Sequence, residues 1–198
     1  MSFVPGLWTL ETGLMKGQDI IILLKLALLQ RQGAAQPKPG NIRADPFSAR
    51  GLEGALGISK SEVSASINRS ADVGLLIKDR KSSIPSTNTR ALQEFIVHGL
   101  KYVFPVKPGP LVRGMPTAAA APILQQKLMS MDQHIHVWPD AEGTEFGQSL
   151  KPLFKSVPDA ARRDPKLYDL LALVDAIRLG NPRESKVARQ LLEKRLNP

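Results

Sequence analysis

The sequence predicts a mostly α-helical protein, with one small β-hairpin in its first half and an α+β second half that ends in a helical hairpin. Three observations support this prediction. Apolar residues recur at helical spacing between residues 17 and 73, a short strand-like segment follows them, and two amphipathic segments close the chain. The 198 residues, 42% of them hydrophobic, are enough for a substantial core. We expect a first domain over residues 1–103 and a C-terminal region over residues 104–198.

Three helices are expected before residue 75. Gly17–Arg31 is apolar over much of its circumference, which indicates a helix buried inside a domain or at a subunit interface. A loop rich in Gly and Pro separates it from a shorter helix at Phe47–Leu56. The third helix is Ser59–Val73, where Ser59 and Glu62 have the spacing of a capping box.

A basic β-hairpin and a fourth helix are expected to follow. Residues 75–89 have the pattern of a short strand, a polar basic tip and a returning strand, with Pro85 at an edge or in the loop. Arg90–Tyr102 resumes helical spacing. The proline-rich segment 104–122 is expected to have no regular structure.

The second half begins with strand-like segments and ends in helices. Alternation over His134–Trp138 predicts a strand, and a turn leads into a further element at Thr144–Phe154. A helical hairpin is expected over residues 164–196, with Asp164 as the N-cap and Pro165 at the first helical position. Both of its helices have an apolar stripe that must be buried against another surface.

Charge and cysteine content narrow the class of protein. The formal net charge is +9, and residues 1–114 hold 15 Lys and Arg against 8 Asp and Glu, so the positive charge is concentrated in the first half. Such a distribution is expected of a surface that meets a polyanion. Cysteine, a signal-peptide pattern and an apolar run of membrane-spanning length are all absent from the sequence. Together these absences favour a cytoplasmic protein without membrane contact.

The segment ARGLEGALGISKSEVSASIN, Ala49–Asn68, has the spacing of two helices joined by a tight turn. Gly57 stands at the turn, where glycine supplies the positive φ that lets the second helix pack on the first. The segment resembles the helix-turn-helix of phage repressors and of MarR-like winged-helix regulators of bacteria. It departs from them at Glu53, where a small residue is usual, and at Ser66, where a larger apolar one is common. The resemblance implies a winged helix-turn-helix over residues 1–103, with the third helix as the recognition helix.

One side of that third helix points away from its partner helix at the helical period. Small and amide side chains on this side suit a DNA major groove: Asn pairs with adenine, Ser donates or accepts, and Ala contacts the thymine methyl group. No Arg is present there to pair with guanine, so a readout that favours A·T pairs is expected. The predicted base-reading residues are Ser61, Ser64, Ala65 and Asn68.

Basic residues around this face are expected to contact DNA phosphates, which position the protein without specifying sequence. Several of them stand in the hairpin, which would form the wing and lie along the adjacent backbone or minor groove. The predicted backbone contacts are Arg43, Arg50, Lys60, Arg69, Lys78, Arg80, Lys81 and Arg90.

Enzyme patterns are weak or missing. The chain lacks a Gly-rich phosphate-binding loop that ends in Lys-Ser or Lys-Thr. His134 and His136 lie on the same side of a strand near Asp140 and Glu142, yet a polar strand face is far commoner than a metal site with two His ligands. We therefore predict no enzyme activity, no cofactor and no metal site.

The sequence thus predicts a bacterial transcriptional regulator that binds a pseudo-palindromic duplex DNA operator as a homodimer. The helix 17–31 and the hairpin 164–196 are the two candidates for the dimer interface. An alternative from another class is a protein-interaction module, such as an antitoxin-type autoregulator whose C-terminal hairpin binds a partner protein. The segments HGLKYVFPVKPGPLVRGMPT and DPKLYDLLALVDAIRLGNPRE also resemble the C-terminal halves of uncharacterised bacterial winged-helix regulators. That resemblance implies a single regulator and no fused enzyme.

Overall fold

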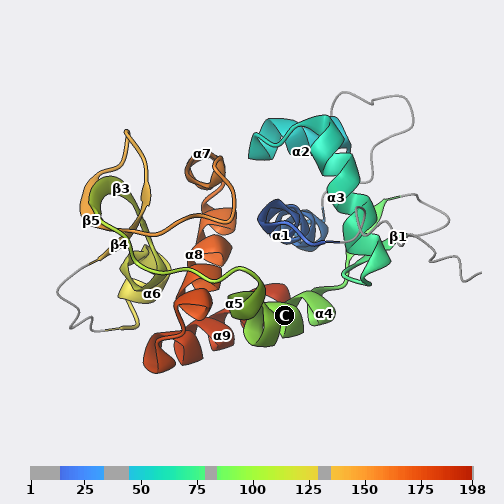
Figure 1. Ribbon diagram of the computed structural model, residues 1–198. Helices are drawn as coiled ribbons and strands as arrows, with labels where there is room; N and C mark the ends of the chain where they lie inside the picture. Colours follow the sequence, from blue (N-terminus) through green and yellow to red (C-terminus); the bar gives the residue numbers. More distant parts are fainter. Residues whose placement is uncertain (1–13, 34–44, 79–83, 129–134, 198) are drawn as a thin grey trace, which may run out of the picture.

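The computed structural model describes residues 14–33, 45–78, 84–128 and 135–197, and the helix α1 (Gly17–Arg31) lies at its centre (Figure 1). The first-half helices α2 and α3 lie on one side of it and the strands of the second half on the other. The further helices are α2 (Ala49–Leu56), α3 (Lys60–Asp72), α4 (Thr89–Glu94), α5 (Leu100–Val103), α6 (Pro122–Gln125), α7 (Val157–Arg163), α8 (Pro165–Leu179) and α9 (Pro182–Leu196), with the π-helical turn η2 (Phe95–Gly99) and the 3-10 turn η3 (Ala118–Ala120). The strands are β1 (Leu76–Lys78), β2 (Pro85–Thr87), β3 (Leu111–Thr117), β4 (His136–Pro139) and β5 (Glu145–Ser149).

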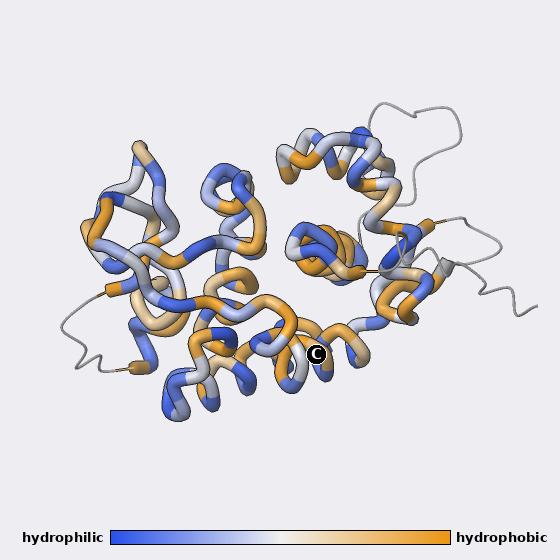
Figure 2. Tube along the Cα trace, viewed as in Figure 1, coloured by the Kyte–Doolittle hydropathy of each residue, from blue (hydrophilic) through white to orange (hydrophobic). Residues whose placement is uncertain are grey.

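Helix α1 has the bounds that its apolar pattern predicts, and it is covered on all sides. No residue from Ile20 to Leu24 is more than 1% exposed, because α1 packs on α3 and β2 of the first half and on α8 of the second. Figure 2 shows apolar residues gathered along it. The sequence allows α1 either a domain interior or a subunit interface, and in the structure α1 lies in the interior. The proposal that residues 17–31 form a dimer interface is therefore wrong, because the chain itself buries them.

Helices α2 and α3 begin and end as the sequence predicts to within two residues. Gly57, at φ +66°, ends α2 in the left-handed conformation that the tight turn requires. Ser59 is the N-cap of α3 and accepts a hydrogen bond from the Glu62 amide. The other half of the predicted capping box differs, because the Glu62 carboxylate turns to α1, where it accepts hydrogen bonds from Gln18 and Lys16.

The predicted hairpin is present as the antiparallel pair β1–β2. Its last register pair joins Lys78 to Pro85, so Pro85 begins the returning strand at its tip-proximal end. Thr87 holds the hairpin on the core, since its hydroxyl donates to the Leu23 carbonyl oxygen of α1 at 3.0 Å. The helix predicted at Arg90–Tyr102 is present as α4 and α5 with the π-helical turn η2 between them.

Strands β3, β4 and β5 close into a small barrel in which each strand pairs with the other two. Glycine makes this closure possible: a Cβ on Gly114 would lie 2.1 Å from the Trp138 carbonyl oxygen, and one on Gly147 2.3 Å from that of Ile135. Strand β3 shows that the prediction of no regular structure over residues 104–122 is wrong. Pro116 fits in β3 because its fixed φ is compatible with an extended chain, although it cannot donate to the ladder.

The C-terminal hairpin is present as α8 and α9. Asp164 caps α8 as predicted, accepting from the amides of Lys166 and Leu167 at 3.0 and 3.2 Å. Every residue of α8 from Leu170 to Arg178 is buried, and the buried apolar residues of both halves of the chain form one continuous cluster. The proposal that the apolar stripes of 164–196 form the dimer interface is therefore wrong as well, because these stripes pack inside the chain.

A buried polar network fixes the barrel to α8. The Asp175 carboxylate accepts from Trp138 Nε1 at 2.6 Å, from Thr117 Oγ1 at 3.0 Å and from Arg178 Nη1 at 2.5 Å. Arg178 also donates through Nε to the Phe104 carbonyl oxygen at 3.1 Å. Because the buried charges are paired and hydrogen-bonded, the network holds α8, the barrel and the connection between them in one arrangement.

Candidate functional site

Helix α3 has one anchored side and one exposed side. Val63, Ser66 and Ser70 are buried against the neighbouring helices. The predicted base-reading residues lie on the other side: Ser61, Ser64 and Asn68 are exposed, and Ala65 is half-buried. These four side chains therefore lie on the side of α3 that faces away from the neighbouring helices, as the helical period predicts.

The N-terminus of α3 is closed by the protein's own groups. The Lys60 amide donates to Glu53 Oε1 at 3.1 Å, and the Ser59 hydroxyl accepts from the Glu62 amide. Glu53, which departs from the helix-turn-helix pattern, is thus accommodated because its carboxylate caps the next helix. The side chain of Lys60 remains exposed at the start of the exposed side.

Arg69 is not positioned as the sequence predicts. It was expected to contact a phosphate, but its Nε and Nη2 donate to the two carboxylate oxygens of Asp19 in α1, at 3.0 and 2.6 Å. The Arg69 side chain is only 11% exposed and that of Asp19 is fully buried. The hydrogen bonds to Asp19 raise the pKa of Arg69 further above its usual value. Arg69 therefore anchors α3 to α1, and we leave it out of any DNA-contacting set.

The remaining predicted backbone contacts are spread over several elements. Arg50 is exposed on α2. Arg90 lies in α4, past the end of the hairpin, and pairs with Glu94 at 3.3 Å on an exposed surface. Lys78 belongs to strand β1, whereas its side chain and the residues Arg43, Arg80 and Lys81 lie outside the part of the chain that the structure describes.

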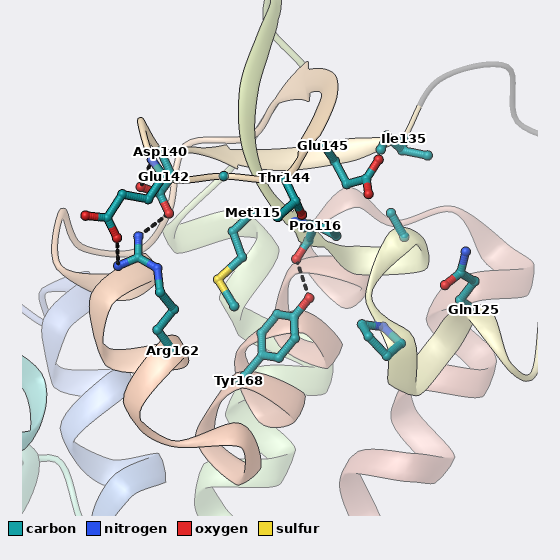
Figure 3. A pocket seen from close by; sticks show the side chains of 13 residues that line it. Met115, Pro116, Gln125, Ile135, Asp140, Glu142, Thr144, Glu145, Arg162 and Tyr168 are labelled. Carbon is teal, nitrogen blue, oxygen red and sulfur yellow. Dashed lines mark hydrogen bonds and ion pairs between the residues drawn. The ribbon is translucent and has the colours of Figure 1, made fainter.

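The second half contains a pocket of about 510 Å³ that the sequence did not reveal (Figure 3). Met115 and Pro116 of β3 and Tyr168 of α8 form its floor, and the turn between β4 and β5 forms one wall. The Tyr168 hydroxyl donates to the Pro116 carbonyl oxygen at 2.8 Å, and burial raises the pKa of Tyr168 to about 12. The lining residues come from five separate segments, so no local pattern in the sequence could indicate the pocket.

Arg162 of α7 is the cation among the residues that line this pocket. It pairs with Asp140, with Glu142 at 3.4 Å and with Asp159 at 2.7 Å. The hydrogen bond from Arg162 to Asp140 is the largest cause of the raised pKa of this guanidinium. Asp140 and Glu142, considered above as metal ligands, are thus held by Arg162.

Helix α7 connects the pocket to the α2–α3 pair. Arg163, next to Arg162 in the chain, donates through Nη1 to the Gly54 carbonyl oxygen of α2 at 2.7 Å. Ser156, the N-cap of α7, donates to the Leu56 carbonyl oxygen at 2.5 Å, and a Cβ on Gly57 would lie 3.2 Å from the Ser156 Cβ. The turn between α2 and α3 is therefore held by α7.

Among the described residues, no group of three or more His, Asp or Glu side chains is arranged to hold a metal ion. His134 lies outside those residues. Within the same ranges, no helix is both long and apolar enough to span a lipid bilayer. Comparison with protein-family models, with curated proteins and with solved structures gives no match.

Proposed function

We propose that the protein is a winged helix-turn-helix regulator that binds duplex DNA with α3 in the major groove and the β1–β2 hairpin beside it. The observation that carries the proposal is the division of α3 into an anchored side and an exposed side of small and amide side chains. The order of three helices followed by an antiparallel hairpin supports it, because this is the order of a winged helix.

The anchored side gives α3 the rigidity that a reading element needs. Arg69 joins α3 to the buried helix α1 by two hydrogen bonds, and Gly57 fixes the turn that precedes α3. A recognition helix held in this way loses little conformational freedom when it enters a groove, so more of the contact energy appears as affinity.

The exposed side has the chemistry of base-edge contacts. Asn68 suits a bidentate contact with adenine, and Ser61 and Ser64 suit single hydrogen bonds. The methyl group of Ala65 suits contact with thymine. We propose that these four residues read an A·T-rich half-site.

The proposed phosphate contacts are the exposed Lys60 and Arg50 and the basic residues of the hairpin, Lys78, Arg80 and Lys81. Arg43 and Arg90 flank them in the sequence. Phosphate contacts release counterions. Each contact therefore makes the slope of the logarithm of affinity against the logarithm of salt concentration steeper by about 0.9.

A homodimer on a two-fold symmetric operator stays part of the proposal, with an interface other than α1 and the apolar stripes of α8 and α9. The same burial argues against a partner protein docked on the apolar face of the C-terminal hairpin, since that face already packs inside the chain. Light scattering at micromolar concentration, with and without the selected duplex, measures the oligomeric state directly.

The test is selection of duplexes from a randomised library, followed by affinity measurements on a selected and a shuffled duplex between about 50 and 200 mM salt. We expect tighter binding of the selected duplex and a steep salt dependence for both. Asn68→Ala should relax the preference at one base pair and cost about 1–3 kcal/mol on the selected duplex. The matched control is Asn181→Ala, because Asn181 is exposed at the start of α9 and its side chain forms no cap hydrogen bond. This variant should keep both the base preference and the affinity for the selected duplex.

A second pair of variants tests the hairpin. Replacement of Lys78, Arg80 and Lys81 by Ala should weaken binding to both duplexes equally and lower the salt slope by about 3. Replacement of three exposed cations of α9, Arg183, Lys186 and Lys194, is the control for net charge. Selection that yields no preferred sequence, or equal effects of the two triple variants, would refute the proposal.

A further inference from the structure

The pocket in the second half has the volume of a small-molecule site. Its volume of about 510 Å³ lies within the usual range of about 300–1,000 Å³ for ligand pockets. Met115, Pro116, Pro122 and Ile135 contribute apolar surface, and the carboxylates of Asp140, Glu142 and Glu145 stand along its upper edge (Figure 3). This combination suits a ligand that is mostly apolar and carries one polar or charged group.

The charged residues around the pocket indicate the sign of charge that such a ligand carries. Asp140, Glu142 and Glu145 line it together with a single cation, Arg162. Arg162 is engaged by Asp140 and Glu142, whereas Glu145 has no cation within ion-pair distance among the described residues. The carboxylates therefore exceed the positive charge, against the overall net charge of +9.

We propose that this pocket binds an organic cation with an apolar body, and that α7 transmits its occupancy to the turn between α2 and α3. The cation pairs with Glu145 and competes with Arg162 for Glu142 and Asp140. Apolar lining side chains, among them Met115 and Ile135, cover the body of the ligand.

The transmission follows from two neighbouring residues of α7. Arg162 faces the pocket, while Arg163 donates to the Gly54 carbonyl oxygen of α2. A cation that releases Arg162 from the rim loosens α7, and with it the contacts of Ser156 and Arg163 on α2. A ligand shifts a conformational equilibrium only by its differential affinity for the two states, and competition with Arg162 supplies that difference. This part rests on the proposed function, because it gives α3 a regulated position on DNA.

The binding test uses tetraphenylphosphonium, an apolar cation, and tetraphenylborate, an anion of nearly the same shape, titrated calorimetrically into the full chain. The positive protein as a whole attracts the anion, so tighter binding of the cation must come from the local carboxylates. We expect the phosphonium to bind at one site and the borate to bind more weakly. Borate binding as tight as that of the phosphonium would overturn the proposal.

Two variants locate the site. Glu145→Gln should weaken phosphonium binding about two- to fivefold, the usual range for an exposed ion pair. Glu193→Gln on the exposed side of α9 is the matched control and should leave the affinity unchanged. Thr144→Trp, at the exposed rim, should block the pocket and abolish binding. Equal affinities of the three variants would place the phosphonium elsewhere and overturn the proposal.

Hydrogen exchange tests the transmission without DNA. The Gly57 amide donates to the Glu53 carbonyl oxygen at 2.8 Å, so its exchange reports on the end of α2. Saturating phosphonium should speed this exchange about threefold or more in the wild type and have little effect in Arg163→Ala, where the link is already cut. Unchanged exchange in the wild type would overturn the transmission, whether or not the protein binds DNA.

Discussion

The Arg69 guanidinium in α3 donates two hydrogen bonds to the fully buried Asp19 carboxylate in α1, at 3.0 and 2.6 Å. This pair joins the proposed reading helix to the central helix of the fold. Because Asp19 is fully buried, its carboxylate depends for solvation on Arg69 and on the Lys16 amide, which donates to it at 2.8 Å. The pair is therefore a structural link, and it removes from the proposed DNA-facing surface a cation that the sequence assigns there.

Asp19→Ala should lower the free energy of unfolding by about 3 kcal/mol, because it removes the acceptor of both Arg69 hydrogen bonds and that of the Lys16 amide, and leaves the largely buried Arg69 with only Glu62 at 3.9 Å. Urea denaturation measures the change. Glu94→Ala, which breaks the exposed pair with Arg90, should cost less than about 0.5 kcal/mol and serves as the control. Similar losses in the two variants would contradict the anchoring role of Asp19.

Arg69→Met should cost about as much stability as Asp19→Ala, yet it should leave the salt slope of DNA binding unchanged under conditions where the variant is folded. The reason is that a guanidinium bound to Asp19 releases no DNA counterion. A slope lowered by about 1 would show that Arg69 meets a phosphate after all.

Two glycines of the α2 region should respond to alanine in opposite directions. Gly57→Ala should destabilise the protein by about 1–2 kcal/mol, because φ is +66° there and the new Cβ would approach the Ser156 Cβ at 3.2 Å. Gly54→Ala should stabilise it by about 0.5–1 kcal/mol, since Gly54 is inside a helix and a Cβ there would meet nothing within 4 Å. Thermal unfolding of the two variants checks the sign of each effect.

Acid should weaken the start of α8. Burial raises the pKa of Asp164, but the hydrogen bond from Lys25 and those from the Leu167 and Lys166 amides outweigh it, so the net pKa lies below its ordinary value. A carboxyl with a lowered folded-state pKa contributes stability above its ordinary pKa and loses it as the pH falls through the lower, folded-state value.

The measurement is the free energy of unfolding of wild type and Asp164→Asn between about pH 3 and 7. The difference between the two should be constant above the ordinary pKa of Asp, about 3.9, and should shrink at lower pH. A difference that grows as the pH falls would contradict the assignment.

Tyr168 should ionise at a higher pH than an ordinary tyrosine. Burial raises its pKa to about 12, and its hydroxyl donates to the Pro116 carbonyl oxygen. The stability that this protonated phenol contributes is present below its ordinary pKa of about 10 and is lost as the pH rises through about 12. The chain has 2 tyrosines, so Tyr102→Phe isolates Tyr168 in an ultraviolet absorbance titration. An ionisation near pH 10 in that variant would contradict the burial of Tyr168.

Local sequence patterns predicted the helices well. Gly17–Arg31 was predicted at its observed bounds because an apolar run from Ile20 to Leu29, interrupted by Lys25, stands between polar residues. Asp164 and Pro165 marked the start of α8, and Gly180, at φ +77°, marks its end. Each of these signals lies within a few residues of the feature that it specifies, so a single sequence contains it in full.

Contacts between residues far apart in the sequence leave no such local pattern, so they were not predicted. The apolar stripes of α1 and α8 show that something must cover them, but the sequence does not show that they cover each other, and a dimer interface was inferred. Arg69 was assigned to DNA for a related reason, because its partner Asp19 is 50 residues away. Strand β3 was missed because prolines stand in and around it and because its register partners lie 19 to 37 residues further along the chain.

The central position of α1 also shapes how the chain must be made. Its cover on one side, α8, is synthesised more than a hundred residues later, and at roughly 5–20 residues per second that delay is on the order of ten seconds. During this time α1, a strongly apolar helix, can be covered by elements of the first half alone. A nascent chain paused before residue 165 would therefore expose the α8-facing side of α1, and we expect the ribosome-bound chain to need a chaperone there until the last two helices emerge.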